Sequence, residues 1–277
     1  MSGLASPVGA AEPVAAPVRK SSVLEQVLVL GRRSLLRVLR SPAQLIFPVV
    51  FPMMLFAVNA SGLGAATKLP GFPTDHYRDF ALAVPFMQGA LFVAISAGTD
   101  LARDIETGFL SRLSMTPMWG PALLAGQLGG AFVVGLVQSV VYVAIGLAVG
   151  VGFQSGPAGV LVLIALSTLI AVGFAGIGAL LALRFGTGEA VQGFFPLLFV
   201  GVFLSSSSLP RDLIQTDWFR TVATYNPVSY LIEGVRSLII TGWDAQALAL
   251  GFGIAAVIAV VALGASTVAL RGRLGRS

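Results

Sequence analysis

The sequence AGVLVLIALSTLIAVGFAGIGALLAL, residues 158–183, contains no charged residue. An α-helix needs about 20 apolar residues to cross the hydrocarbon of a bilayer, so this segment is long enough to span it. The uncharged run already begins at residue 113, and residues 113–183 together are too long for one helix. The turn-forming sequence QSGP at residues 154–157 divides the run. We therefore predict two consecutive spans, near residues 122–151 and 158–183.

The composition is also typical of a membrane-embedded chain. Of the 277 residues, 56% are hydrophobic and 10% are charged, and the mean hydropathy is +0.90. Soluble domains carry about 25% charged residues, so a soluble fold of this composition would lack polar side chains to cover its surface. We predict an all-α integral membrane protein with six transmembrane helices. The four other spans lie near residues 43–66, 80–99, 190–208 and 246–270.

The first span contains two prolines, Pro48 and Pro52. Proline has no backbone N–H, so each proline deprives a carbonyl one turn earlier of its donor within the helix. We expect a kink in this span, and we expect neighbouring helices to satisfy the freed carbonyls.

A cluster of charged side chains follows the second span. Each would cost about 2.5–3.5 kcal/mol at the bilayer centre, whereas a Leu, Ile, Val or Phe returns only about 0.3–0.6 kcal/mol. The cluster must therefore lie outside the hydrocarbon. Leu101, Ile105 and Phe109 recur at helical spacing, which predicts a short charged helix within residues 100–121; an ordinary solvated loop is the alternative. The charged members are Asp100, Arg103, Asp104, Glu106 and Arg112.

The basic residues indicate the orientation. With the N-terminus inside, inner segments hold 12 of the 17 Lys and Arg residues, which the positive-inside rule favours. We predict that both termini are cytosolic, with a disordered tail over 1–21, a membrane domain over 22–270 and a basic tail over 271–277. Residues 1–21 do not suit a signal peptide, because the basic pair Arg19-Lys20 comes last. This topology explains the net charge of +5 without a nucleic-acid partner.

Residues 22–40 have an apolar face and a basic face, which is typical of a helix that lies in the membrane interface. This interface helix would anchor the chain to anionic lipids, contact a cytosolic partner, or do both. Its basic face consists of Arg32, Arg33, Arg37 and Arg40.

The segment 209–244 is expected on the outer side. Asn226 is suited to the N-cap of a helix and Pro227 to its first position. Aromatic residues that favour the membrane–water boundary, such as Trp218 and Tyr225, accompany them. We expect one or two short helices that dip into the outer leaflet without crossing it, or an amphipathic loop packed on the bundle.

Few residues suggest chemistry. The chain has no Cys, and its single His76 lies beside Asp75 and Asp79 in a predicted loop, where a solvated side chain is expected rather than a metal ligand. A phosphate-binding loop needs Gly-Lys-Ser/Thr, and Lys occurs only at positions 20 and 68. Polar and aromatic side chains within the spans are candidates for a substrate path, although such side chains more often form helix–helix hydrogen bonds or pack in the core. These candidates are Gln88, Gln138, Gln192, Phe195 and Phe199.

Two motifs carry a resemblance to a known family. The first has the pattern acidic-x-Glu-x-Gly-x-Leu-x-Arg-Leu-x-x-Thr-Pro, and its residues are Asp104, Glu106, Gly108, Leu110, Arg112, Leu113, Thr116 and Pro117. The second is SSSSLP at residues 205–210 followed by Asn226, Pro227, Tyr230, Glu233 and Arg236. With six spans after a basic amphipathic helix, the chain resembles the permease subunits of ABC-2 type transporters, in particular bacterial export permeases of the daunorubicin-resistance type.

The resemblance implies the membrane half of a multidrug exporter in the bacterial inner (plasma) membrane. A separate cytosolic ATPase subunit would bind ATP and Mg, with no cofactor in this chain. Two permease copies, identical or related, would pair and release an apolar or amphipathic compound outward. The residues implied in coupling to the ATPase are Arg103, Asp104, Glu106, Gly108 and Arg112.

Three alternatives stay open at this point, one of which is a membrane scaffold or receptor with no effect on ATP turnover. The same fold could export a polysaccharide or a lipid. An integral membrane enzyme that modifies lipids is a different class, for which the Asp104/Glu106 pair is the only candidate site, without a convergent partner.

Overall fold

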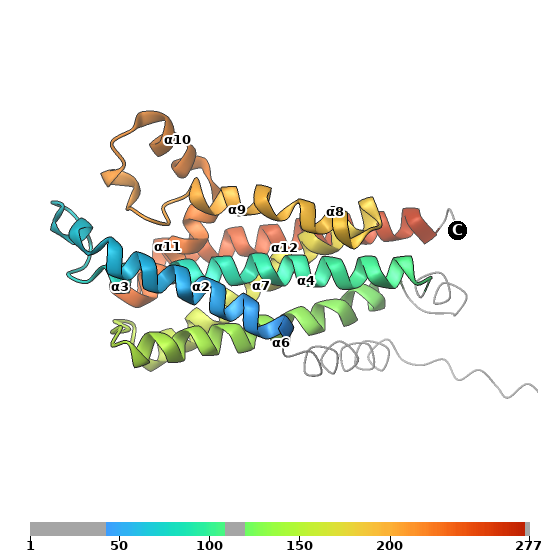
Figure 1. Ribbon diagram of the computed structural model, residues 1–277, viewed down its shortest axis with the longest axis horizontal. Coiled ribbons are helices and arrows are strands. Elements are labelled where there is room, and N and C mark those ends of the chain that lie inside the picture. Colours follow the sequence, from blue (N-terminus) through green and yellow to red (C-terminus); the bar gives the residue numbers. More distant parts are fainter. Residues whose placement is uncertain (1–42, 109–119, 275–277) are drawn as a thin grey trace, which may run out of the picture.

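The computed structural model describes residues 43–108 and 120–274, and within these ranges every regular element is a helix (Figure 1). The predicted interface helix, Arg112, the N-terminal tail and residues 275–277 lie outside the described residues, whereas residues 271–274 of the predicted C-terminal tail are the last turn of a helix. The elements are α2 (Ala43–Gly62), η1 (Gly64–Lys68), α3 (Tyr77–Ala81), α4 (Ala83–Glu106), α6 (Gly120–Ala148), α7 (Gly156–Phe185), α8 (Gly188–Gly193), α9 (Phe195–Phe203), η2 (Arg211–Leu213), α10 (Asp217–Tyr225), α11 (Pro227–Ile240) and α12 (Ala245–Leu274).

Four of the described helices are long and apolar enough to cross a membrane. They are Tyr77–Glu106, Leu128–Ala148, Gly156–Phe185 and Ala245–Arg273. The first and fifth predicted spans correspond to shorter apolar helices, Ile46–Gly62 and Gly188–Phe203. The all-helical class is therefore confirmed for the described residues, with four candidate membrane spans, whereas the count of six spans stays a prediction.

Three predicted boundaries are corrected. The first span ends at Gly62, and a 3-10 helix follows it. The fifth is divided at Phe194, because Pro196 has no N–H to continue the ladder, and it ends at Phe203. The separate charged helix is wrong for its described part: residues 100–106 are the last turns of α4, since Leu101 and Ala102 continue its buried face.

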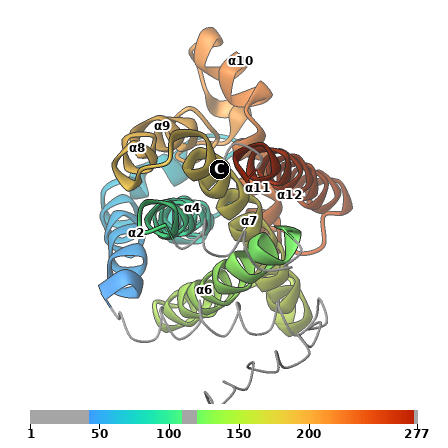
Figure 2. The same cartoon turned by 90° about the vertical axis from the view of Figure 1, so that its right-hand side faces the viewer.

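The helix α7 lies at the centre of the bundle and packs against α4, α6 and α12 (Figure 2). Glycine permits its closest contact: a Cβ added at Gly178 would lie 1.8 Å from the carbonyl oxygen of Ala94. Only a residue without a side chain lets two helix backbones approach so closely. The α4–α7 crossing therefore depends on this position.

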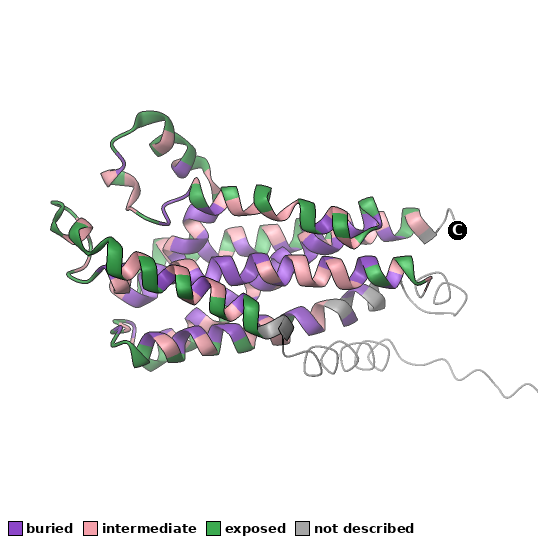
Figure 3. Ribbon diagram, viewed as in Figure 1, coloured by how far each residue is buried: buried purple, intermediate pink, exposed green. Residues whose placement is uncertain are grey.

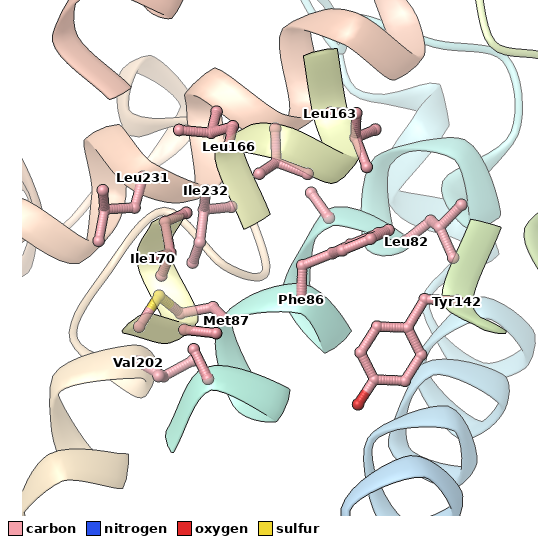
Figure 4. Packing of buried hydrophobic residues seen from close by; sticks show 14 of the residues in the cluster. Leu82, Phe86, Met87, Tyr142, Leu163, Leu166, Ile170, Val202, Leu231 and Ile232 are labelled. Atoms are coloured by element: carbon pink, nitrogen blue, oxygen red, sulfur yellow. The ribbon is translucent and has the colours of Figure 1, made fainter. Parts of the chain in front are cut away.

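The core between these helices consists of large apolar side chains. Phe86 and Met87 of α4 belong to one buried cluster with Leu166 and Ile170 of α7, to which α11 also contributes (Figure 4). By contrast α12 exposes apolar side chains such as Val260, 71% exposed, on its outer face (Figure 3). An apolar exposed face of this kind suits lipid contact.

The freed carbonyl in α2 is satisfied as predicted. Pro52 cannot donate to the carbonyl of Pro48, and the hydroxyl of Tyr142 in α6 donates to that oxygen instead, at 2.7 Å. Tyr142 is 1% exposed. The interhelical hydrogen bond replaces the missing intrahelical one.

Candidate functional site

Sequence-predicted residues gather at two ends of the bundle, which we call the Glu106 end and the Arg236 end. The Glu106 end consists of the last turns of α4, the start of α8 and the C-terminal turns of α7 and α12 (Figure 1). The Arg236 end consists of α3, α11 and the turn at residues 204–208, with α10 beside them.

At the Glu106 end, the charged residues of α4 differ in exposure. Arg103 and Glu106 are exposed, whereas Asp104 is 5% exposed. The helix ends at Glu106, with Thr107 as its C-cap, and Gly108 has a φ of +67°, a left-handed conformation that glycine adopts readily. The residues predicted to couple to an ATPase therefore occupy, in the part that the structure describes, two faces of a helix end.

The carboxylate of Glu106 accepts a hydrogen bond from the backbone N–H of Gly188, at 3.1 Å. Gly188 is the first residue of α8, and the Thr187 hydroxyl caps the same helix by accepting from the N–H of Ala190 at 3.3 Å. A negative charge is favoured at a helix N-terminus. Glu106 thus links α4 to the α8–α9 segment, a contact that sequence reasoning missed because 82 residues separate the partners.

Two further contacts join helices at this end. Arg273 of α12 donates to the carbonyl of Leu183 in α7 at 2.9 Å. A separate apolar cluster joins α4, α6, α7, α8 and α12, and its buried members are Leu101, Ala102, Leu124, Ala179, Ala182, Leu183, Val191 and Leu270. A displacement of the end of α4 would consequently act on all of these helices.

At the Arg236 end, Asn226 is the N-cap of α11, as predicted. Its side-chain oxygen accepts from the N–H of Val228 at 2.9 Å, and Pro227 is the first helical residue. Its amide nitrogen donates to the carbonyls of Gly201 and Leu204, at 2.7 and 2.9 Å. One side chain therefore starts α11 and holds the C-terminal end of α9.

Arg236 is 4% exposed and donates to three backbone carbonyls, those of Phe80 at 3.2 Å, Ser206 at 2.9 Å and Ser207 at 3.1 Å. Its guanidinium lies 3.5 Å from the ring centroid of Phe80. Burial lowers the pKa of Arg236 to about 9, so the side chain stays charged at neutral pH. Arg236 thus fastens α3 and the 204–208 turn to α11.

Tyr230 and Glu233 both contact Arg211. Glu233 forms an ion pair with Arg211, whose guanidinium lies 4.5 Å from the ring centroid of Tyr230. The Tyr230 hydroxyl donates to the carbonyl of Thr224 at 2.9 Å. These contacts attach the segment 211–225 to α11. This segment contains α10, which projects away from the bundle (Figure 1).

The candidate path residues lie in different places. Phe195 and Phe199 belong to a series of aromatic rings shared by α2, α4 and α9, in which neighbouring ring centroids are 5.2–6.2 Å apart. Gln88 and Gln138 are buried, and Gln192 is exposed on α8. Of the five, only Gln88 lines the cavity at the Arg236 end.

Within residues 43–108 and 120–274, no group of three His, Cys, Asp or Glu side chains could hold a metal ion. His76 lies in an exposed loop, where its backbone N–H donates to the Thr74 hydroxyl at 3.0 Å.

Comparisons with known proteins agree on one family. The family model described as "ABC-2 type transporter" matches residues 25–240. The chain is 29% identical over 205 residues, covering 71% of this chain and 69% of the relative, to "Daunorubicin resistance ABC transporter permease protein DrrB1" of Streptomyces coeruleorubidus. It is 24% identical over 219 residues, 78% of each chain, to "Probable doxorubicin resistance ABC transporter permease protein DrrC" of Mycobacterium tuberculosis. It is 26% identical over 218 residues, 77% of this chain and 74% of the relative, to "Putative transport permease ycf38" of Porphyra purpurea.

Proposed function

The chain belongs to the ABC-2 type transporter family, and from this premise we propose that it moves an apolar or amphipathic compound outward with energy from a separate ATPase subunit. Its relatives are ABC transporter permeases, so the chain is a transport subunit and not a lipid-modifying enzyme. The observation that carries the mechanism is the hydrogen bond between Glu106 and the start of α8. The bacterial relatives named for daunorubicin and doxorubicin resistance support a drug-like compound and a bacterial plasma membrane.

In the proposed topology, α2 and the α8–α9 segment add two crossings to the four long helices, and both termini are cytosolic. The Glu106 end then faces the cytosol and the Arg236 end faces outward. The distribution of Lys and Arg supports this orientation. The arginines at 32, 33, 37 and 40, outside the described residues, would bind anionic lipid headgroups.

The ATPase subunit, which would bind ATP and Mg, would seat the charged end of α4 and the segment after it in a cleft. α4 has 24 residues, and at 1.5 Å per residue it is about 36 Å long, enough to reach across the hydrocarbon. A push on its end would move a rigid helix. Glu106 would transmit the same push to α8 and α9. Asn226, which is bonded to the end of α9, would transmit it to the turn at residues 204–208.

Two permease copies would release the compound between them. Coupling requires that the two conformations of the bundle differ in affinity for the ATP-bound motor. In this mechanism Arg103 and Arg112 are docking contacts, Gly108 ends the α4 helix, and Glu106 transmits the movement to α8.

The test is daunorubicin uptake into inverted membrane vesicles that contain the permease and its co-purifying ATPase subunit. Glu106→Arg should abolish ATP-dependent uptake while the protein still inserts, because an arginine side chain cannot accept the hydrogen bond from the N–H of Gly188 and the link between α4 and α8 is lost. Glu189→Arg is the matched control, since Glu189 is an exposed carboxylate on the first turn of α8, and it should retain most of the uptake. Normal uptake by the Glu106→Arg variant would refute the role of Glu106.

A further inference from the structure

The helices α7 and α12 end side by side at the Glu106 end, and each end carries an exposed arginine. These are Arg184 in the last turn of α7 and Arg271 in the last turn of α12. The two ends are joined, because Arg273 donates to the carbonyl of Leu183 at 2.9 Å. We propose that this junction binds an anionic phospholipid, whose phosphate contacts Arg184 and Arg271 and whose acyl chain lies along α12.

The two exposed arginines have no counter-charge within the described part of the chain. Neither Arg184 nor Arg271 forms an ion pair with any residue in 43–108 or 120–274. The acidic residue nearest to Arg184 along the chain is Glu189, which is exposed and pairs with neither arginine. Arginine binds phosphate through charge-assisted hydrogen bonds, and basic sites between membrane helices bind anionic lipid headgroups. An anion from the surroundings is therefore the counter-charge that suits this junction.

An exposed apolar stripe on α12 leads directly to Arg271. Its members recur every three or four positions, which places them on one side of the helix. They are Val257, Val261, Gly264 and Val268, and Arg271 is the next exposed position in the series. From Val257 to Val268 the helix rises about 17 Å at 1.5 Å per residue. One leaflet contributes roughly 15 Å to a hydrocarbon core of about 30 Å, so the stripe has the length of one acyl chain and ends at a positive charge.

A second copy of the chain is the other candidate for this face of α12. In a two-fold pair the same surface contacts itself. Two copies inserted in the same direction would therefore bring Arg271 against the Arg271 of the other copy. Like charges at such a contact are unfavourable, whereas an anionic phospholipid supplies the opposite charge. Charge complementarity favours the lipid.

The apolar stripe also distinguishes a phospholipid from a free phosphate ion. A free ion would contact the arginines alone and would leave the valines of α12 without a partner. A phospholipid satisfies the charge and covers the stripe together, and it would bridge the central helix α7 to α12. Only the assignment of this site to the inner leaflet rests on the proposed function; the binding itself does not.

The experiment measures lipid binding at the junction by fluorescence quenching in detergent micelles. The chain has no Cys, so Gly272→Cys provides a single labelling position; Gly272 is exposed, and an added Cβ there meets no atom within 4 Å. The probes are phosphatidylglycerol and phosphatidylcholine that carry the same 5-doxylstearoyl chain, and only quenching relieved by unlabelled phosphatidylglycerol is counted. Each basic residue near an anionic headgroup contributes a factor of about five in affinity. With two arginines, phosphatidylglycerol should bind about 25-fold more tightly than phosphatidylcholine, and equal affinity for the two lipids would overturn the proposal.

Four variants in the labelled background locate the site. Arg184→Gln and Arg271→Gln should each weaken phosphatidylglycerol binding about fivefold without weakening phosphatidylcholine binding. Arg220→Gln is the matched control, because it removes the same charge from an exposed arginine of α10 at the opposite end of the bundle. Arg271→Lys keeps the charge and should bind phosphatidylglycerol within about twofold of the parent. Unchanged binding in either junction Gln variant, an equal loss in Arg220→Gln, or a loss in Arg271→Lys as large as in Arg271→Gln would refute the assignment.

Two further measurements exclude the other occupants. An excess of glycerol 1-phosphate should not relieve the quenching, because it lacks the acyl chain; relief would indicate a free-anion site and overturn the lipid assignment. Disulfide cross-linking of Val268→Cys between two copies, without displaceable quenching, would assign the face to a second copy instead. No ATPase takes part in these measurements. A permease that binds phosphatidylglycerol here but does not transport would refute the proposed function alone, and one that transports without this binding would refute only the lipid site.

Discussion

The hydrogen bond from Tyr142 to the carbonyl of Pro48 should stabilise the bundle only because Pro52 follows one turn later. Tyr142→Phe removes the hydroxyl and leaves this buried oxygen without a donor. An unsatisfied buried acceptor costs about 1–3 kcal/mol, and hydrogen bonds between membrane helices have contributed at most about 1.7 kcal/mol. These two ranges overlap at about 1–1.7 kcal/mol, which is the loss in the free energy of unfolding that we expect for Tyr142→Phe.

The second substitution, Pro52→Ala, restores an N–H to the helix at the position that normally donates to the carbonyl of Pro48. In that background the Tyr142 hydroxyl is no longer the sole donor. Tyr142→Phe should then cost less than about 0.5 kcal/mol, a coupling of about 1 kcal/mol between the two positions. Unfolding of the purified protein by dodecyl sulfate in mixed micelles would measure all four members of the cycle.

Tyr77→Phe is the matched control. Tyr77 is also buried, and its hydroxyl donates to the backbone carbonyl of Ser208. Unlike the carbonyl of Pro48, this carbonyl has not lost a helical donor to a proline. Its cost should be the same with and without Pro52→Ala. If Pro52→Ala also leaves the cost of Tyr142→Phe unchanged, the reasoning is refuted. The stabilisation by the Tyr142 hydroxyl would then not depend on the donor that Pro52 removes.

Two further substitutions test the packing by the same unfolding measurement. Arg236→Met should lower the free energy of unfolding by about 3–5 kcal/mol, because three backbone carbonyls lose a charged donor. The guanidinium no longer has to be removed from water, but this gain offsets only part of the loss. The control Arg220→Met replaces an exposed arginine and should change the free energy of unfolding by less than about 1 kcal/mol. Gly178→Ala should cost about 3 kcal/mol or more, since its Cβ would overlap the carbonyl oxygen of Ala94. Gly253→Ala, where the added Cβ meets no atom within 4 Å, should be neutral or stabilising. Equal effects within either pair would contradict these assignments.

The elements that could be predicted are those with strong local signals. The break between α6 and α7 follows from Gln154-Ser155-Gly156-Pro157, and the start of α11 follows from Asn226-Pro227. The missing donor in α2 follows from Pro52 alone. Each depends on the chemistry of one to four neighbouring residues and on the length that a bilayer requires.

The partners of these residues depend on contacts between distant segments. Local sequence shows that Pro48 needs a donor but not that Tyr142, 94 residues away, supplies it. Glu106 reads as an exposed charge until folding brings the start of α8 beside it.

The amino-acid sequence by itself determined that the chain enters a membrane as helices, because the transfer of apolar and charged side chains depends on composition and order alone. Only the tertiary structure decided which helices touch and which polar atoms pair. Those contacts depend on backbone separation, such as the approach of Gly178 to Ala94, and on three-dimensional direction, as in the three carbonyls around Arg236. Neither quantity is a property of residues adjacent in the chain.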